Sequence, residues 1–205
     1  MPLLELSGLT WETRGTRRGL PPGPLTVDSG STAVVVAADC AEADTFTDIL
    51  LGLEMPDDGL IRVGGEEVTM RLPVDRKIGL VPAGAGLLPH LTVEQNLSFA
   101  AVSLTRGSVA YMAKQAKIEG FLRSRPHELA HDERLDIAVA RARLLPIRVV
   151  VVEDRTGYGP CHAAVSAALR TNPDLAVLVV ADDRTRVASL ASPSRFWEIA
   201  DVPEP

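Results

Sequence analysis

Two adjacent carboxylates, Glu153 and Asp154, directly follow a run of valines at 149–152. Such an apolar, β-branched run predicts a buried strand, so both carboxylates would lie at the edge of a sheet. Carboxylates are ligands that Mg²⁺ accepts, and an aspartate can orient a water molecule. The pair is therefore a candidate metal and catalytic site. The alternative is that both carboxylates are merely hydrated at the sheet edge.

Further acidic residues follow two other apolar runs. Asp39, Glu42 and Asp44 come after the run at 33–37, and Asp182 and Asp183 come after the run at 176–181. In open α/β sheets, ligands bind beyond the carboxyl ends of the strands. These residues are therefore candidates for the same kind of site as the first pair.

Composition excludes several classes of protein. The net charge of −6 over 205 residues argues against nucleic-acid binding, which needs a basic face. No apolar run reaches the roughly 18 residues of a membrane span, and the first residues lack the pattern of a signal peptide. The two cysteines form no C-x-x-C pair. We expect a cytoplasmic protein without direct membrane insertion.

Apolar runs alternate with helical patterns along the rest of the chain, which is typical of an α/β protein with a mainly parallel sheet. Buried strands are predicted at 33–36, 77–81, 149–152 and 176–180, and flatter strands at 3–9, 25–27, 60–63 and 195–200. Helices are predicted at about 44–53, 93–103, 108–123, 133–144, 161–170 and 184–190.

A series of segments, in this order and spacing, resembles the ATP-binding cassette (ABC) ATPase domain. They are residues 4–10, 27–33, 50–65, 78–82, 87–97, 125–129 and 134–143. The resemblance implies a P-loop NTPase-like core, with a mostly parallel sheet flanked by helices and an antiparallel β region at the N-terminus. It also implies one domain over 1–205, with a shortened helical subdomain inserted at about 92–145.

The phosphate-binding loop of this family reads GxxxxGK[ST], because backbone N–H groups cradle the phosphates while the Lys and a hydroxyl serve the phosphates and Mg²⁺. By the resemblance, the two glycine positions fall on Ala37 and Glu42, the lysine on Ala43 and the hydroxyl on Asp44; Thr45 follows one place later. The prediction is that this loop is degenerate. The adenine-stacking aromatic falls near Thr13, with Trp11 close by.

The remaining family motifs depart in the same way. The Q-loop glutamine falls on Ala83, and the switch histidine falls on Asp182. The acidic pair Asp-Glu of the family becomes Glu153-Asp154, followed by Arg155 instead of proline. The signature LSGGQ corresponds to Leu129, Ala130, His131, Asp132 and Glu133.

From these departures we predict a protein that is not an enzyme and uses no cofactor or metal: a catalytically inactive pseudo-ATPase. It would bind an ABC permease, a functional ABC ATPase, or both, as a scaffold or regulator. The pairing could be a homodimer or a heterodimer, at the inner face of the cell membrane. By the family's fold, the acidic residues 39, 42, 44, 153, 154, 182 and 183 would converge on a negatively charged crevice. Two alternatives stay open: a weak metal-dependent nucleotidase using Glu153, Asp154 and Asp182, and a soluble regulator that binds a ligand in the crevice.

Overall fold

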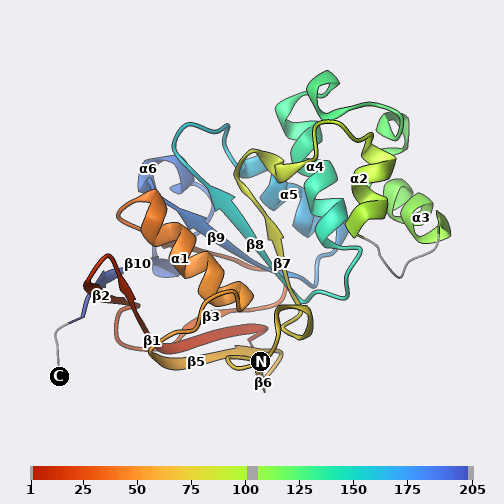
Figure 1. The fold of residues 1–205 in the computed structure, drawn as a ribbon. Helices are drawn as coiled ribbons and strands as arrows, with labels where there is room; N and C mark the ends of the chain where they lie inside the picture. The colour runs from red at the N-terminus through yellow and green to blue at the C-terminus, as the bar shows by residue number, and fades with distance from the viewer. Residues whose placement is uncertain (1, 101–105, 203–205) are drawn as a thin grey trace.

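The computed structural model describes residues 2–100 and 106–202 (Figure 1). Two sheets and a group of helices make up this part of the chain. Within it, no helix has both the length and the apolar character needed to span a membrane.

The central buried layer is a parallel sheet with the strand order β10-β4-β9-β8-β7. Its strands are β4 (Thr32–Val36), β7 (Ile78–Val81), β8 (Val149–Asp154), β9 (Ala176–Ala181) and β10 (Phe196–Glu198). Helices cover both faces, so the central strands are buried on both sides and read as continuous apolar runs. The predicted buried strands are confirmed.

The second sheet is antiparallel, in the order β11-β2-β1-β5-β6, with β3 also paired to β1. Its strands are β1 (Leu4–Thr13), β2 (Thr16–Gly19), β3 (Leu25–Val27), β5 (Asp58–Val63), β6 (Glu66–Glu67) and β11 (Ala200–Asp201). Helix α1 (Cys40–Leu51) lies between the two sheets, and its buried face joins them in one core (Figure 1). Trp11 belongs to this core: its ring is 2% exposed and stacks on Phe46 with centroids 5.4 Å apart.

The helical region contains α2 (Val93–Ala100), α3 (Arg106–Ala116), the short turns η3 (Glu119–Phe121) and η4 (Pro126–Glu128), and α4 (His131–Ala142). It has an apolar cluster of its own, built around Val93, Leu97 and Ile137. Buried Asn96 fixes the approach to α2, because its side-chain amide donates to the carbonyls of Leu88 and Thr92. α4 also packs against α5 (His162–Thr171), which joins this region to the parallel sheet.

The boundaries of several elements differ from the sequence prediction. The helix predicted at 108–123 ends at Ala116, because Lys117 adopts a left-handed backbone conformation, with φ of 59°. The helix predicted at 184–190 is the short α6 (Arg184–Val187). Part of the helix predicted at 93–103 lies outside the described residues. The remaining short turns are η1 (Pro73–Asp75), η2 (Ala83–Gly86) and η5 (Pro193–Arg195).

The strand predicted at 195–200 is divided between the two sheets. β10 pairs in parallel with β4, whereas β11, which begins two residues after β10 ends, pairs with β2 in the antiparallel sheet. A single short segment thus forms an edge of each sheet.

Candidate functional site

The carboxyl ends of β4, β8 and β9 meet the N-terminus of α1, and most of the predicted acidic residues gather there. Asp39 is the N-cap of α1, with extended backbone, and its Oδ1 accepts a hydrogen bond of 2.8 Å from the Glu42 N–H. This is the position at which an aspartate stabilises a helix, by satisfying a free N–H and opposing the positive end of the helix dipole.

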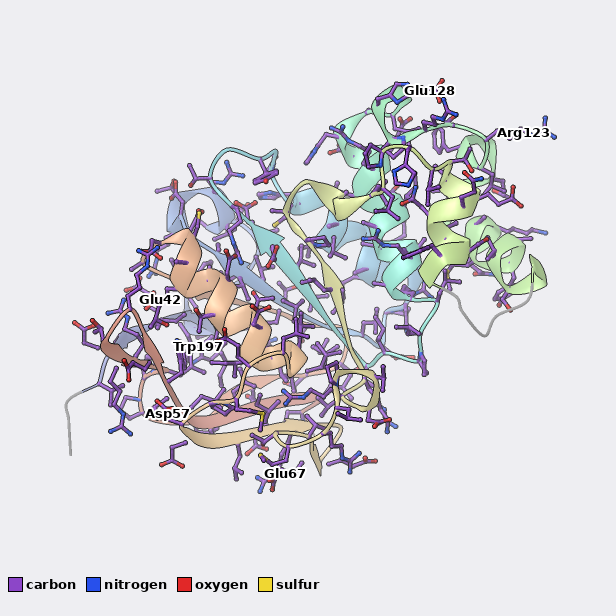
Figure 2. All side chains as sticks on the ribbon, viewed as in Figure 1. Glu42, Asp57, Glu67, Arg123, Glu128 and Trp197 are labelled. Atoms are coloured by element: carbon purple, nitrogen blue, oxygen red, sulfur yellow. The ribbon has the colours of Figure 1, made fainter. Side chains whose placement is uncertain are left out.

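Glu42 is buried on α1, with 3% of its surface exposed. Glu42, labelled in Figure 2, accepts a hydrogen bond of 2.6 Å at Oε2 from the Ala38 N–H, and its Oε1 forms an ion pair with Arg18 of β2. Glu42 therefore uses a backbone N–H of the loop before α1. Three of the other predicted loop residues carry no charge: Ala37 and Ala43 are buried and apolar, and the Thr45 hydroxyl donates to the Ala41 carbonyl.

Arg155 is the central charge of the site. Its side chain is 5% exposed, and its Nη2 lies 3.3 Å from Oδ1 of Asp44 and 3.0 Å from Oε1 of Glu153. Its Nη1 donates to the Val180 carbonyl over 2.6 Å. The second oxygen of Glu153 accepts a hydrogen bond of 3.1 Å from the Ala83 N–H, so the Q-loop position is joined to the same network.

Glu153 and Asp154 do not act as a pair. Successive side chains of a strand point to opposite faces of the sheet, so Asp154 and Glu153 contact different residues. The Asp154 side chain is fully buried; its Oδ1 lies 2.5 Å from Nε of Arg186, and its Oδ2 accepts from the Cys161 N–H over 2.9 Å. Among the described residues, no group of three or more His, Cys, Asp or Glu side chains is arranged to hold a metal ion.

Asp182 faces the loop after β8. It accepts hydrogen bonds from the backbone N–H and the hydroxyl of Thr156 and from the Cys40 thiol. Burial alone would raise the pKa of Asp182, but the hydrogen bonds from Cys40 and Thr156 outweigh it and leave the pKa below its usual value. The same contact with Asp182 raises the pKa of the Cys40 thiol.

Asp183 turns away from this group and caps α6, where its Oδ1 accepts from the Thr185 N–H over 2.8 Å. Cys161 is buried beside Asp154, and burial raises the pKa of its thiol. Of the predicted acidic residues, Asp44 and Glu153 thus pair with Arg155 and Asp182 binds the adjacent Thr156, while Asp154 and Asp183 are used in neighbouring structural contacts.

The segment predicted to match the signature lies at the start of α4. Leu129 is buried, and Glu133 accepts a hydrogen bond from the Ala130 N–H, which caps the helix. His131 lies 3.1 Å from the Pro160 carbonyl. Within the described residues, no hydrogen bond or ion pair joins Leu129, Ala130, His131, Asp132 or Glu133 to the residues around Arg155.

The prediction of a crevice with a large excess of negative charge missed the arginines. Arg18, Arg155 and Arg186 each form an ion pair with a carboxylate at this end of the molecule. Arg155 could have been noticed from its place directly after Glu153-Asp154, where the resemblance expects proline. Neither Arg18 nor Arg186 stands at a spacing that predicts its contact.

The residues present do not fit a divalent metal ion between Asp44 and Glu153. In P-loop NTPases, Mg²⁺ is held by the loop hydroxyl and by the Asp of the family's acidic pair, the positions that the resemblance assigns to Asp44 and Glu153. Here the Arg155 guanidinium already lies between the two side chains. A cation of the chain itself supplies the positive charge.

Comparison with known proteins gives a consistent result. The family model "ABC transporter" matches residues 27–156. A probable sulfate/thiosulfate import ATP-binding protein of Chlorella vulgaris is 30% identical over 146 residues, which cover 68% of this chain and 62% of the relative. A Fe(3+) ions import ATP-binding protein of Mesorhizobium japonicum is 29% identical over 211 residues, which cover 94% of this chain and 57% of the relative. The chain therefore spans less than two thirds of the length of these curated relatives.

Solved structures show the same fold at low sequence identity. The cbiO1 subunit of a Clostridium perfringens ABC transporter complex aligns with a TM-score of 0.72 and 18% identity, over 93% of this chain and 82% of that one. A nucleotide-free ATP-binding cassette from an ABC transporter aligns with a TM-score of 0.75 and 13% identity, over 93% of this chain and 85% of that one. The predicted fold class is thereby confirmed.

The same comparisons overturn one prediction. We predicted that the chain is not an enzyme, yet its relatives are named ATP-binding proteins of importers, and the family match includes the loop and strand residues on which that prediction rested. The prediction was wrong, and the pseudoenzyme interpretation loses its support. The contacts of Arg155 with Asp44 and Glu153 therefore do not argue against ATP binding; they concern which positive charge lies between these two carboxylates. With the family model covering more than half of its residues, the chain belongs to the ABC transporter family of ATP-binding proteins.

Proposed function

We propose that this chain is the ATP-binding-cassette subunit of a transport assembly, in which it regulates or supports a permease, a second cassette subunit, or both. The observation that carries the proposal is the helical region at about 92–145, which we take to be the docking insertion of a single domain. It has its own buried core, yet Phe99 of α2 and Tyr111 of α3 are 69% and 65% exposed.

Most of the other apolar residues of this region stabilise the helical region itself. Val109 is buried, and Met112, Phe121 and Leu122 pack against the same apolar cluster. Phe99 and Tyr111 are left as large apolar side chains in water on adjoining helices, and such side chains are favourable contacts for a protein partner.

The partner chemistry follows from the relatives. They are named import ATP-binding proteins for sulfate or thiosulfate, thiamine and Fe(3+) ions, so the shared element is a transporter and not one substrate. We propose a polytopic permease as the partner of the helical region, at the cytoplasmic face of the membrane, and no particular transported substrate.

The test is affinity purification of the tagged chain from native membranes in mild detergent, with mass spectrometry of the co-purified proteins. A stoichiometric protein with several membrane spans is expected with the wild type. Phe99→Glu and Tyr111→Glu should remove it, because a charge at a desolvated contact is costly. Val74→Glu is the matched control, since Val74 is 82% exposed and lies outside the helical region. Purification of the wild type without any membrane protein would refute the proposal.

A further inference from the structure

Arg155 stands between two carboxylates that come from distant parts of the sequence. Asp44 lies on α1 and Glu153 at the end of β8, and both contact the same Nη2 atom. We propose that the Arg155 guanidinium is a built-in cation, which takes the place of a divalent metal ion between Asp44 and Glu153. The site then needs no Mg²⁺ to balance these carboxylates.

The position of Arg155 is fixed from several sides. Besides the two carboxylates, Nη1 donates to the Val180 carbonyl of β9, and Nη2 lies 3.5 Å from the Thr47 hydroxyl of α1. A guanidinium has several donors in a planar fork, so it can serve these acceptors together. Arg155 therefore connects α1, β8 and β9 with one charge, as a metal ion would.

The residues at the two positions match each other chemically. A hydroxyl at residue 44 would give Arg155 a neutral neighbour, whereas Asp44 gives it an opposite charge. Because a buried guanidinium is costly unless it is paired, the carboxylate at 44 and the arginine at 155 support each other.

Removal of Arg155 should convert this place into a metal site. Both carboxylate oxygens lie within 3.3 Å of one nitrogen atom, so a single ion near that point could reach both after a small movement. Mg²⁺ is commonly held in proteins by one or two carboxylates and several waters, and Mn²⁺ prefers the same ligands.

The experiment measures thermal unfolding of the purified full chain, in EDTA and in millimolar Mn²⁺ or Mg²⁺. The wild type should show no metal-dependent change in Tm. Arg155→Ala should have a lower Tm in EDTA and should gain about 3–6 °C at a Mn²⁺ concentration ten times the Kd. Adding Asp44→Asn to Arg155→Ala should abolish that gain.

Two further variants keep the test decisive. Arg155→Gln retains a donor for the Val180 carbonyl but no charge, so it should gain the same metal response even where the alanine variant fails to fold. Arg170→Ala is the matched control, because it removes an arginine paired with Asp136 at the surface and should give no metal response. A metal-dependent rise in Tm of the wild type that Asp44→Asn removes would overturn the proposal. So would the absence of any metal response in Arg155→Gln.

Discussion

Two buried arginines hold opposite ends of α1, and their partners differ. Near the C-terminal end, Arg76 donates to the carbonyls of Ile49 and Leu50, over 2.7 and 3.1 Å. Near the N-terminal end, Arg155 contacts the carboxylate of Asp44. The end of a helix exposes carbonyls and carries partial negative charge, while its start carries partial positive charge. Arg76 is thus accommodated by the backbone alone, whereas Arg155 needs carboxylates.

The difference in partners distinguishes Arg76, which has a structural role, from Arg155, which belongs to the candidate site. Arg76 is completely buried, and burial lowers its pKa. Its further contacts, to the Thr69 and Arg71 carbonyls, are again with backbone. The Arg76 guanidinium joins the loop before β7 to α1 through hydrogen bonds to four backbone carbonyls. A metal ion could not donate these hydrogen bonds.

The largest expected effect comes from Arg76→Ala. It leaves the carbonyls at the end of α1 without a donor and opens a cavity, so the free energy of unfolding should fall by about 3–5 kcal/mol. Urea unfolding of the variant measures this loss, and Mn²⁺ should not restore it. Arg71→Ala is the control, because Arg71 is an exposed arginine paired with Glu66, and its loss should be within about 0.5 kcal/mol. Equal effects of the two variants would remove the contrast between Arg76 and a surface arginine.

An intermediate effect is expected at Gly52, the C-cap of α1. Gly52 has a φ of 80°, and a Cβ there would lie 2.4 Å from Nε of Arg76. Gly52→Ala should therefore cost about 2–3 kcal/mol, from backbone strain together with displacement of the guanidinium. Gly15→Ala isolates the strain, because Gly15 has a φ of 77° with no atom within 4 Å of the added Cβ, and it should cost about 1 kcal/mol. If Gly52→Ala and Gly15→Ala lower the free energy of unfolding equally, the position of Arg76 does not require a glycine at residue 52.

The smallest effect concerns the pH dependence of the contacts that Asp182 makes. The pKa of Asp182 is lowered in the folded chain, so its stabilising contribution is present above about pH 4 and is lost as the pH falls through the folded value. Asp182 is only partly buried, so Asp182→Asn should cost about 0.5 kcal/mol at neutral pH. In urea unfolding from pH 7 to 3, this difference from the wild type should shrink toward zero. The loss in Arg76→Ala should stay constant over that range, because carbonyls do not titrate.

The fold was more predictable from the sequence than the site. The valine runs at 149–152 and 176–180 predict buried strands because a parallel sheet covered on both faces admits little else. The convergence of Asp44, Glu153 and Asp182 also follows from the ends of such strands. The ion pairs do not: Asp44 and Arg155 are 111 residues apart, and which acceptor a long side chain reaches depends on its packing. The separation of Glu153 from Asp154 does follow from the sequence, because successive side chains of a strand point to opposite faces.

The segment from Phe196 to Asp201 has a consequence for the order of assembly. It forms an edge of both sheets, and it is synthesised after every strand with which it pairs. Until it emerges from the ribosome, β4 and β2 each present a row of unpaired backbone groups, which is the kind of edge that recruits strands from other chains. The nascent protein is therefore exposed to misassembly at both sheets until this one short segment is available, and its pairing with β4 and β2 covers the two edges together.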